Sequence, residues 1–577
     1  MFTRCRIATT AIPGTCPEDA GGEYDSYNST FEAADGGNPV LVSVVGNLVD
    51  IVWGADAETP QPDYPDEPLL ILDWEKYTGE TWQQKIWEYD GSNGLDSIRS
   101  KLNEASADAI VVSKLDEVAW LFNLRGKDVP SNPMFFSYAI IKLDAIYLYL
   151  YDKDGRLVND VKTHLGIGTG ACVDESTTEA PECVTVRDYS KFLGDLETLS
   201  EDRIWISDQM SYAIYDRSTC VRYLMASPVL LMKAVKSPKE IEGMNNAHFK
   251  DSIVLCELGA WLQETMDELE DPAVGDIEVL SELIVADKAM KLREAMPDNE
   301  GLSFGAISAF GPNGAVIHYK STEESNVPIT NQGTFLFDSG SQYLDGTVDI
   351  TRTFHFGEPS AFVKEAYTRV LLGHIDLALG TFRTGIYGRE IDVLAREPLW
   401  RNGLDYNHGT GHGIGHFLNV HEQPARIRIG YRSHEEPLEL GMFQSDEPGY
   451  YEDNVFGIRI EDIMYTVEAE TDHKFNDYTY MTWKMCSLVP LEPKMINFEM
   501  FTPKEIDWYN AYNQRIITEL GPALMDLDDG NLAYDWMMSK TGGVEYEYKV
   551  RYSAASSLYV SFMSLISLSF IAVIFGI

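Results

Sequence analysis

The stretch that decides the fold is Phe335-Leu336-Phe337-Asp338-Ser339-Gly340, and Val348-Asp349-Ile350-Thr351 follows it closely. Their apolar and β-branched residues predict two buried strands, each carrying an acid. A buried carboxylate is costly unless it is paired with a cation or bound to a metal. Either acid alone is typical of a salt-bridged structural residue. Two acids in consecutive strands, joined by a turn at Asp345-Gly346, fit that structural interpretation less well. A hairpin would bring the two carboxylates to one place.

A glycine-rich run with clustered histidines lies further along the chain. It is His408-Gly409-Thr410-Gly411-His412-Gly413-Ile414-Gly415-His416, and His421 follows, so four of the 11 histidines fall close together. The run lacks the HExxH motif of helical zinc proteases, and its glycines disfavour a helix. No lysine follows as in a phosphate-binding P-loop. We therefore interpret the run as a loop or short turn that presents imidazoles.

Two glutamates complete the set of candidate ligands. Glu447 lies in Ser445-Asp446-Glu447-Pro448-Gly449, and Glu461 ends Gly457-Ile458-Arg459-Ile460-Glu461, which has the alternation of a strand. Either glutamate alone is typical of a solvated strand edge. Together with Asp338 and Asp349, they would place four negative charges at one site, where mutual repulsion raises pKa values steeply.

Two divalent cations would balance these four carboxylates. With the imidazole of His412, the set offers hard oxygen ligands and one nitrogen, which suits manganese, cobalt or zinc. Two metal ions about 3.5–4 Å apart can hold a bridging hydroxide and polarise a carbonyl. The residues therefore predict a dinuclear hydrolase.

Taken together, these stretches resemble the metallopeptidases with the pita-bread fold, and specifically aminopeptidase P, the Xaa-Pro aminopeptidases. The resemblance runs from about residue 47 to residue 520. Besides the histidine run, it is carried by LDEVAWLFNLRG at 115–126, NPMFFSYA at 132–139, GPNGAVIHY at 311–319, DSGSQYLDGTVDITRT at 338–353 and DEPGYY at 446–451.

The resemblance implies an α/β (α+β) protein with a carboxy-terminal pita-bread domain of the creatinase/aminopeptidase kind, preceded by a creatinase N-terminal-like α/β domain. Relatives usually have three domains, and we expect the first to be largely missing here, because residues 1–39 do not resemble it. We expect a truncated or divergent amino-terminal region and linker at 1–66, the non-catalytic domain at 67–234, the catalytic metallopeptidase domain at 235–540, and a spacer with a hydrophobic tail at 541–577.

The resemblance also assigns the metal ligands. Asp349 and Glu461 would bridge two metal ions. Asp338 would bind one of the ions, and His412 and Glu447 would bind the other.

Further residues are implied to take part in catalysis together with Glu447. His318, His408 and His421 would position the peptide and stabilise the tetrahedral intermediate. Arg459 would support the site electrostatically. Relatives commonly have HEGP where this chain has His421-Glu422-Gln423-Pro424, so Gln423 would alter the rim of the cleft.

The implied reaction removes the first residue of peptides whose second residue is proline, through a hydroxide that bridges two divalent ions. Manganese is the expected metal, with zinc as the alternative because membrane-anchored relatives are associated with it. The Xaa-Pro amide has no N–H, so a cleft can select the pyrrolidine ring by its shape. A prolidase-type dipeptidase, a non-catalytic peptide-binding protein of the same fold and a two-metal phosphoesterase are the alternatives, and a homodimer stays open.

Composition and charge exclude several classes of partner. The chain has 577 residues, of which 44% are hydrophobic and 24% charged, as in globular proteins. Its 45 Lys and Arg against 91 Asp and Glu give a net charge of −46. Nucleic acids and anionic lipid surfaces are therefore not expected partners, because both need clustered cations.

The end of the sequence predicts attachment to a membrane. Residues 558–577 carry no charge and are long enough to cross a bilayer, and small residues precede them. This pattern favours a glycolipid (GPI) anchor signal and an enzyme on the extracellular face of the plasma membrane. The alternative is a tail anchor with a cytosolic catalytic domain, which the lack of a signal-peptide core near residue 1 favours. Cys172 and Cys183 flank a Thr/Glu/Pro-rich loop, and either a disulfide or two free thiols would fit there.

Local signals predict several elements. Ser237-Pro238-Lys239-Glu240 is a capping box that opens a long helix to about Met266, and Thr502-Pro503-Lys504-Glu505 opens another. Helices are also expected near 361–380 and 388–402, a helix or turn at 115–124, and a strand pair at 139–150.

Overall fold

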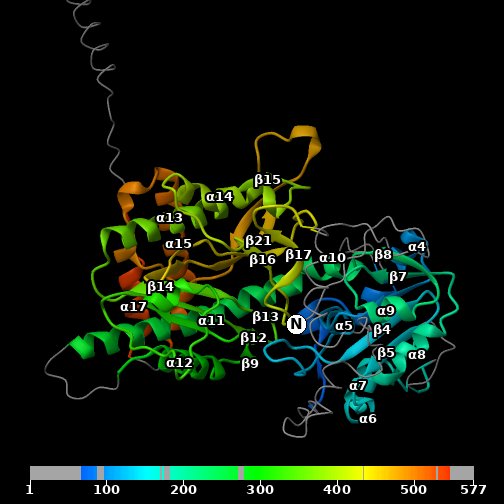
Figure 1. Ribbon diagram of the computed structural model, residues 1–577. Helices are drawn as coiled ribbons and strands as arrows, with labels where there is room; N and C mark the ends of the chain where they lie inside the picture. The colour runs from blue at the N-terminus through cyan, green and yellow to red at the C-terminus, as the bar shows by residue number, and fades with distance from the viewer. Residues whose placement is uncertain are drawn as a thin grey trace, which may run out of the picture.

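The computed structural model describes residues 67–87, 97–168, 170, 172–174, 182–270, 279–432, 435–527 and 530–545. The predictions for residues 1–66 and for the apolar tail at 558–577 lie outside these residues. The described residues form an amino-terminal unit, at the right of Figure 1, and a larger unit at the left. Within the described part, no helix has both the length and the apolar content that a bilayer crossing needs.

The amino-terminal unit is built on a six-stranded sheet. In order across the sheet, its strands are β6 (Val184–Asp188), β5 (Ile146–Leu150), β4 (Ser137–Lys142), β2 (Ala109–Val112), β7 (Arg203–Ser207) and β8 (Val221–Met225). Strand β4 is antiparallel to both its neighbours, and the other five run in one direction. The hairpin of β4 and β5 confirms the predicted strand pair.

Helices cover both faces of this sheet. Strand β2 is therefore buried along its whole length and is apolar throughout, as expected for a central strand. One face packs against α3 (Trp82–Ile86), α4 (Ile98–Ala105), α5 (Leu115–Leu121), α7 (Asn159–His164) and α10 (Pro228–Ala234), and the other against α8 (Phe192–Glu197) and α9 (Tyr212–Arg217). A short strand pair, β1 (Leu70–Ile71) with β3 (Leu124–Arg125), and α6 (Lys153–Arg156) complete the unit.

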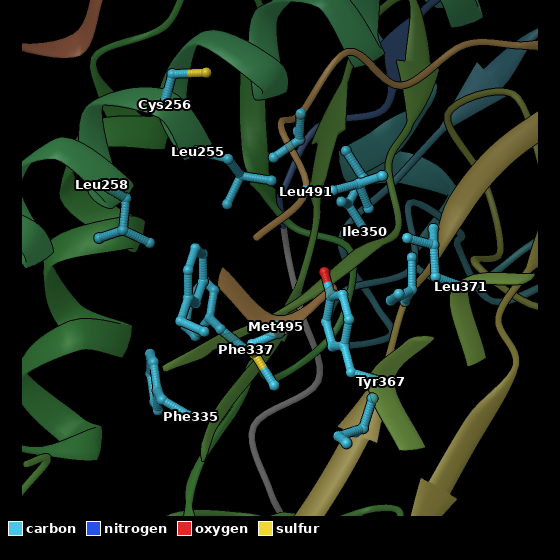
Figure 2. Close-up of a cluster of buried hydrophobic side chains, with 14 of the residues drawn as sticks. Leu255, Cys256, Leu258, Phe335, Phe337, Ile350, Tyr367, Leu371, Leu491 and Met495 are labelled. Atoms are coloured by element: carbon cyan, nitrogen blue, oxygen red, sulfur yellow. The ribbon is translucent and has the colours of Figure 1, made fainter. Parts of the chain in front are cut away.

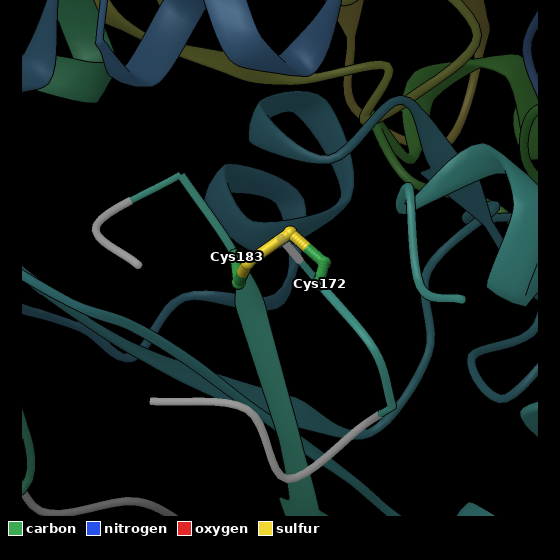
Figure 3. Close-up of a disulfide and its surroundings, with 2 residues drawn as sticks. All are labelled: Cys172 and Cys183. Carbon is green, nitrogen blue, oxygen red and sulfur yellow. A yellow bond between two sulfur atoms is a disulfide. The ribbon is translucent and has the colours of Figure 1, made fainter. Parts of the chain in front are cut away.

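A disulfide closes a loop at the edge of this sheet. Cys172 and Cys183 are bridged, with Cα atoms 5.3 Å apart, and Cys183 immediately precedes β6 (Figure 3). Of the two alternatives for Cys172 and Cys183, a disulfide or two free thiols, the structure has the disulfide.

The larger unit contains four sheets. The first three-stranded sheet has the spatial order β10 (Ile307–Phe310), β11 (Thr334–Ser339), β14 (Ile350–His355). The second has the order β13 (Gly346–Thr347), β12 (Ser341–Tyr343), β9 (Asn299–Leu302). The six-stranded sheet is β15 (Thr381–Arg383), β22 (Tyr480–Met485), β21 (Asp462–Glu468), β18 (Phe443–Asp446), β16 (Gly411–Gly413), β17 (Glu422–Ile427). Strands β19 (Gly449–Glu452) and β20 (Phe456–Arg459) form a pair.

Long helices pack on both sides of these strands (Figure 1). Helix α11 (Pro238–Glu270) begins at the predicted capping box, where Ser237 and Glu240 bond each other's backbone N–H groups. Helix α15 (Pro503–Arg515) begins at the second predicted box. Helices α13 (Ala361–Ala378) and α14 (Gly388–Trp400) confirm the other two expected helices, and α12 (Glu282–Glu294), α16 (Gly521–Met525) and α17 (Leu532–Lys540) complete the set.

The main core lies between these helices and the strands that carry the decisive sequence. Figure 2 shows side chains of α11, β11 and α13 meeting there, among them Leu255, Phe335, Phe337 and Tyr367. Because side chains alternate along a strand, Phe335 and Phe337 face this core and Asp338 faces away from it. Core packing thus aims the acid of β11 at the opposite side of the sheet.

The predicted hairpin is correct in its pairing and in the place of its turn, but its arms pass through a second sheet. Strands β11 and β14 are antiparallel neighbours, and Asp338 lies opposite Thr351. Between them, β12 and β13 pair around the turn that contains Asp345, and these two strands belong to a separate sheet. Gly340 permits this branch: a Cβ there would lie 1.8 Å from the carbonyl oxygen of Val348.

The histidine run is also more ordered than predicted. His412 lies on the short strand β16 rather than in a loop. A Cβ at Gly411 would lie 2.0 Å from the carbonyl oxygen of Ser445, so only glycine lets β16 lie this close to β18.

Candidate metal centre and active site

Five strand ends bring the predicted metal ligands together. Asp338 comes from β11, Asp349 precedes β14, and His412 lies on β16. Glu447 lies between β18 and β19, and Glu461 between β20 and β21. The strands are far apart in sequence but adjacent in space, so the sheets hold the five side chains at one place.

The ligand atoms form three overlapping groups, in each of which all atoms lie within 4.8 Å of one another. Asp338, Asp349 and Glu461 form the first, and His412, Glu447 and Glu461 form the second. Glu461 belongs to both, and the Nε2 atom of His412 lies 3.4 Å from Oδ2 of Asp349. This is the arrangement of two neighbouring ion sites that share carboxylates.

The third group adds a residue that was not predicted to lie among the ligands. His421 offers a ring nitrogen close to Asp349 and His412. Its ring centroid lies 4.1 Å from that of His412. The side chain is exposed, so it forms a wall of the site that a substrate can reach.

The carboxylates repel one another in the absence of cations. Burial and the charge of Asp338 hold the pKa of Asp349 well above its usual value. Burial and the charge of Asp349 do the same for the pKa of Glu461. Burial also raises the pKa of Glu447 to about 7, although His412 and Arg459 act against this. Cations bound at this site would therefore strongly stabilise the ionised carboxylates.

Hydrogen bonds prepare the imidazole of His412 for a metal. Its Nδ1 lies 2.9 Å from the carbonyl oxygen of Gly413, so Nδ1 carries the proton and Nε2 presents its lone pair to Asp349 and Glu447. Such a bond on the far nitrogen is what orients metal-binding histidines. Ser445 adds a second constraint, because its hydroxyl accepts from the His412 amide and donates to Glu447.

Arg459 links the ligands to a second group of polar residues. Its guanidinium donates to Oδ2 of Asp338 at 2.6 Å and to the hydroxyl of Tyr451 at 2.8 Å. The Tyr451 hydroxyl lies 3.0 Å from Nε2 of His408, whose Nδ1 bonds the carbonyl of Gly409. Burial and the charge of Arg459 lower the pKa of His408 to about 3. His408 is therefore neutral and accepts the Tyr451 proton at Nε2.

The remaining predicted histidines border the same space. The neighbouring imidazole of His412, together with burial, lowers the pKa of His421 to about 3. His318 is exposed and lies close enough to depress the pKa values of both His408 and His421. The structure thus brings all nine predicted residues to one site, where His318, His408 and His421 line its open side.

Sequence reasoning missed several supporting residues. Thr351 donates to Oε2 of Glu461 and accepts from Arg459, and Tyr451 connects Arg459 to His408. His374 of α13 is buried between Asp446 and Asp462, which adjoin Glu447 and Glu461. Thr351 and Tyr451 lie within the stretches that carried the resemblance, but nothing near His374 in the sequence indicates its place.

The residues fit a pair of divalent ions. In the described part of the chain, the buried Oδ1 atom of Asp338 has no hydrogen-bond partner, although Oδ2 is bonded. Buried polar atoms rarely stay unpaired unless a ligand or ion completes them. Carboxylate oxygens with imidazole nitrogens are suitable donors for a first-row divalent metal.

Comparison with known protein families supports this picture. Residues 242–468 match metallopeptidase family M24, residues 60–240 the creatinase/prolidase N-terminal domain, and residues 479–544 the C-terminal region of the M24 peptidases.

Individual relatives cover most of the chain. Xaa-Pro aminopeptidase 2 of Homo sapiens is 36% identical over 94% of this chain and 76% of its own length. Xaa-Pro aminopeptidase ApepP of Drosophila melanogaster is 39% identical over 84% of this chain and 74% of its own. The solved X-prolyl aminopeptidase of Caenorhabditis elegans, described as a cytosolic enzyme with a di-nuclear active site, has a TM-score of 0.76 and 32% identity, over 90% of this chain and 79% of that one.

The chain therefore belongs to metallopeptidase family M24. It has the α/β pita-bread fold and is a metalloaminopeptidase with a dinuclear metal site.

Proposed function

We propose that the chain, a metal-dependent Xaa-Pro aminopeptidase, removes the first residue of peptides whose second residue is proline. The observation that carries the proposal is the convergence of Asp338, Asp349, His412, Glu447 and Glu461 on one site, where Glu461 is shared by two ligand groups. Two divalent ions held there supply Lewis acidity, which activates water and polarises the scissile carbonyl. In this assignment Asp349 and Glu461 are the shared ligands.

The chain's own residues orient the peptide. His408 is neutral and anchored by Gly409 and Tyr451, so its ring forms a fixed wall beside Arg459. His318 and His421 are exposed toward the same space and can donate to the carbonyl oxygen as it gains negative charge. Arg459 adds a permanent positive charge, because the neighbouring Tyr451 and Asp338 outweigh its burial and raise its pKa.

We further assign manganese as the preferred metal, with zinc as the alternative. The proposed ligands are four carboxylates and one imidazole, and hard oxygen donors favour manganese over thiophilic metals. Zinc accepts the same donors at similar distances, so the protein itself does not discriminate strongly between the two.

Hydrolysis of short peptides tests the activity. The metal-reconstituted protein is assayed on an Xaa-Pro-Pro tripeptide, an Xaa-Pro dipeptide and an Xaa-Ala-Pro tripeptide, with Mn²⁺ or Zn²⁺ added. We expect release of the first residue from Xaa-Pro-Pro alone at a substantial rate. Preference for the dipeptide would identify a prolidase, and hydrolysis of none of them by a metal-loaded protein would overturn the proposal. Glu461→Gln serves as the inactive control.

We also propose that the enzyme acts at the extracellular face of the plasma membrane, held there by a glycolipid anchor that replaces its apolar tail. The Cys172–Cys183 disulfide supports this location, because disulfides persist mainly in oxidising compartments. The uncharged residues 558–577 with small residues before them support a glycolipid anchor.

A further inference from the structure

The position of His421 depends on the backbone that carries it. In the described part of the chain, no hydrogen bond reaches its imidazole, which packs on the ring of His412. His421 immediately precedes β17, whose first residues are Glu422 and Gln423. Contacts that hold these two residues therefore also hold the backbone from which the imidazole of His421 projects.

Glu422 is held by a buried cluster of charges. Its side chain is 2% exposed and accepts from Nζ of Lys233 at 2.9 Å and from Nζ of Lys236. Lys233 also lies 3.1 Å from Oδ2 of Asp116, on helix α5 of the amino-terminal unit. Burial opposes the charge of Lys233, but Glu422 and Asp116 outweigh it and raise the pKa of its ammonium. The carboxylates of Glu422 and Asp116 and the ammonium groups of Lys233 and Lys236 thus form a neutral cluster between the amino-terminal unit and the larger unit.

The amino-terminal unit forms hydrogen bonds with residues 416–423 at two further points. Nζ of Lys114, just before α5, donates to Oε1 of Gln423 at 3.1 Å and to Gln209 at 3.1 Å. Arg125 of β3 donates to the carbonyl oxygens of His416 at 3.0 Å and Phe417 at 2.6 Å. The segment from His412 to His421 is therefore fixed near its middle and at its end by residues outside the catalytic unit.

We propose that Glu422 is a positioning residue for His421, through which the amino-terminal unit sets the place of this imidazole in the active site. The inference rests on the proposed role of His421 toward the peptide. Displacing a catalytic histidine by about 1 Å can lower the rate about 100-fold. The contacts of Glu422 with Lys233 and Lys236 and of Gln423 with Lys114, which we call the clamp, are therefore expected to affect kcat. The amino-terminal unit then contributes to turnover without contributing a ligand.

A double-mutant cycle tests the proposal. Glu422→Gln is expected to lower kcat by about 10- to 100-fold with little change in KM and with the metal content retained. In the His421→Asn background, the same substitution should change kcat by less than about 2-fold, because the group it positions is gone. An equal loss in both backgrounds, or a loss of bound metal, would show a purely structural role and overturn the proposal.

A milder pair of variants keeps the test decisive if Glu422→Gln does not fold. Lys114→Met removes the contact with Gln423 at a side chain that is 26% exposed, and Lys101→Met on α4 removes a lysine of similar exposure that pairs with Glu104. We expect a kcat about 3-fold lower for Lys114→Met, the worth of one hydrogen bond, and no change for Lys101→Met. Equal kcat values for both variants would contradict the clamp.

A readout without turnover separates this inference from the proposed activity. Carbethoxylation of His421 by diethylpyrocarbonate, followed by mass spectrometry, reports the setting of the ring in protein without substrate. We expect its rate to change in Glu422→Gln and Lys114→Met and to stay the same in Lys101→Met. An inactive wild-type protein that shows this pattern would refute the proposed function and leave the clamp intact, whereas unchanged rates in all variants would refute the clamp.

Discussion

Asp349, Glu447 and Glu461 show at the residue scale why the site requires cations. Each is a carboxylate with a raised pKa, because burial and neighbouring negative charges oppose its ionisation. Metal binding needs these same groups in their ionised form. The folded protein therefore carries an electrostatic cost in its metal-free state that bound ions remove.

The first prediction is that Glu447 destabilises the metal-free protein increasingly as the pH rises from 5 to 8. Glu447 has a pKa of about 7 when folded and 4.5 when unfolded, so between these values the folded state holds more protons than the unfolded state. The contribution of Glu447 to the free energy of unfolding then falls with rising pH, by on the order of 3 kcal/mol. Thermal midpoints of chelator-treated and metal-reconstituted protein at several pH values measure the effect.

The Glu447→Gln variant is the control for this dependence. It removes the titrating group, so the metal-free variant should lose less stability over the same pH range than the metal-free wild type. The same pH dependence of the midpoint in metal-free wild type and metal-free Glu447→Gln would contradict the prediction.

At the scale of elements, the site depends on the register of β18 and β21. Asp446 and Asp462 lie directly opposite each other on these strands and adjoin Glu447 and Glu461. His374 of α13 lies between them, 3.2 Å from Asp446 and 3.3 Å from Asp462. Burial opposes its charge, but the two carboxylates prevail and raise its pKa to about 10. A buried cation thus joins the two strands that supply the glutamates.

The second prediction concerns the His374→Asn substitution. It leaves two buried carboxylates without their shared cation, so we expect a loss of about 3–5 kcal/mol in stability. Metal affinity should fall by about 10-fold or more, because the strands that aim Glu447 and Glu461 are no longer joined. Thermal unfolding and metal titration measure both effects, and the exposed His473→Asn variant is the matched control.

The pH dependence distinguishes this role of His374 from simple packing. Its folded pKa of about 10 exceeds the ordinary value of 6.5, so its contribution is complete below pH 6.5 and is lost as the pH rises toward 10. The stability difference between wild type and His374→Asn should shrink over that range. A constant difference would indicate packing alone.

At the scale of the whole molecule, local patterns predicted much of the fold. The capping boxes at Ser237 and Thr502 mark helix starts by short-range hydrogen bonds, and both helices begin there. Asp338 and Asp349 drew attention because acids in apolar strands need a partner, and the family resemblance assigned the full set of ligands. These features depend on residues that are close in sequence, so they can be recognised in a single sequence without a structure.

Long-range contacts could not be predicted in the same way. Arg125 bonds the carbonyl of His416 across 291 positions, and Lys233 bonds Glu422 across 189. No local period or motif encodes which lysine reaches which carboxylate at such separations. The branch of β12 and β13 between β11 and β14 was missed for the same reason, because it depends on β9, from an earlier part of the chain.

The last prediction concerns the compartment in which the whole molecule works. If the enzyme lies outside the cell on a glycolipid anchor, a phosphatidylinositol-specific phospholipase should release Xaa-Pro-cleaving activity from intact cells. The released protein should carry the Cys172–Cys183 bridge, detected by mass spectrometry of non-reduced peptides. A cytosolic catalytic domain would instead keep both thiols reduced, because glutathione and thioredoxin maintain free cysteines there. Activity that stays on the membrane, together with peptides from residues 558–577 in the mature protein, would replace the lipid anchor with a tail anchor.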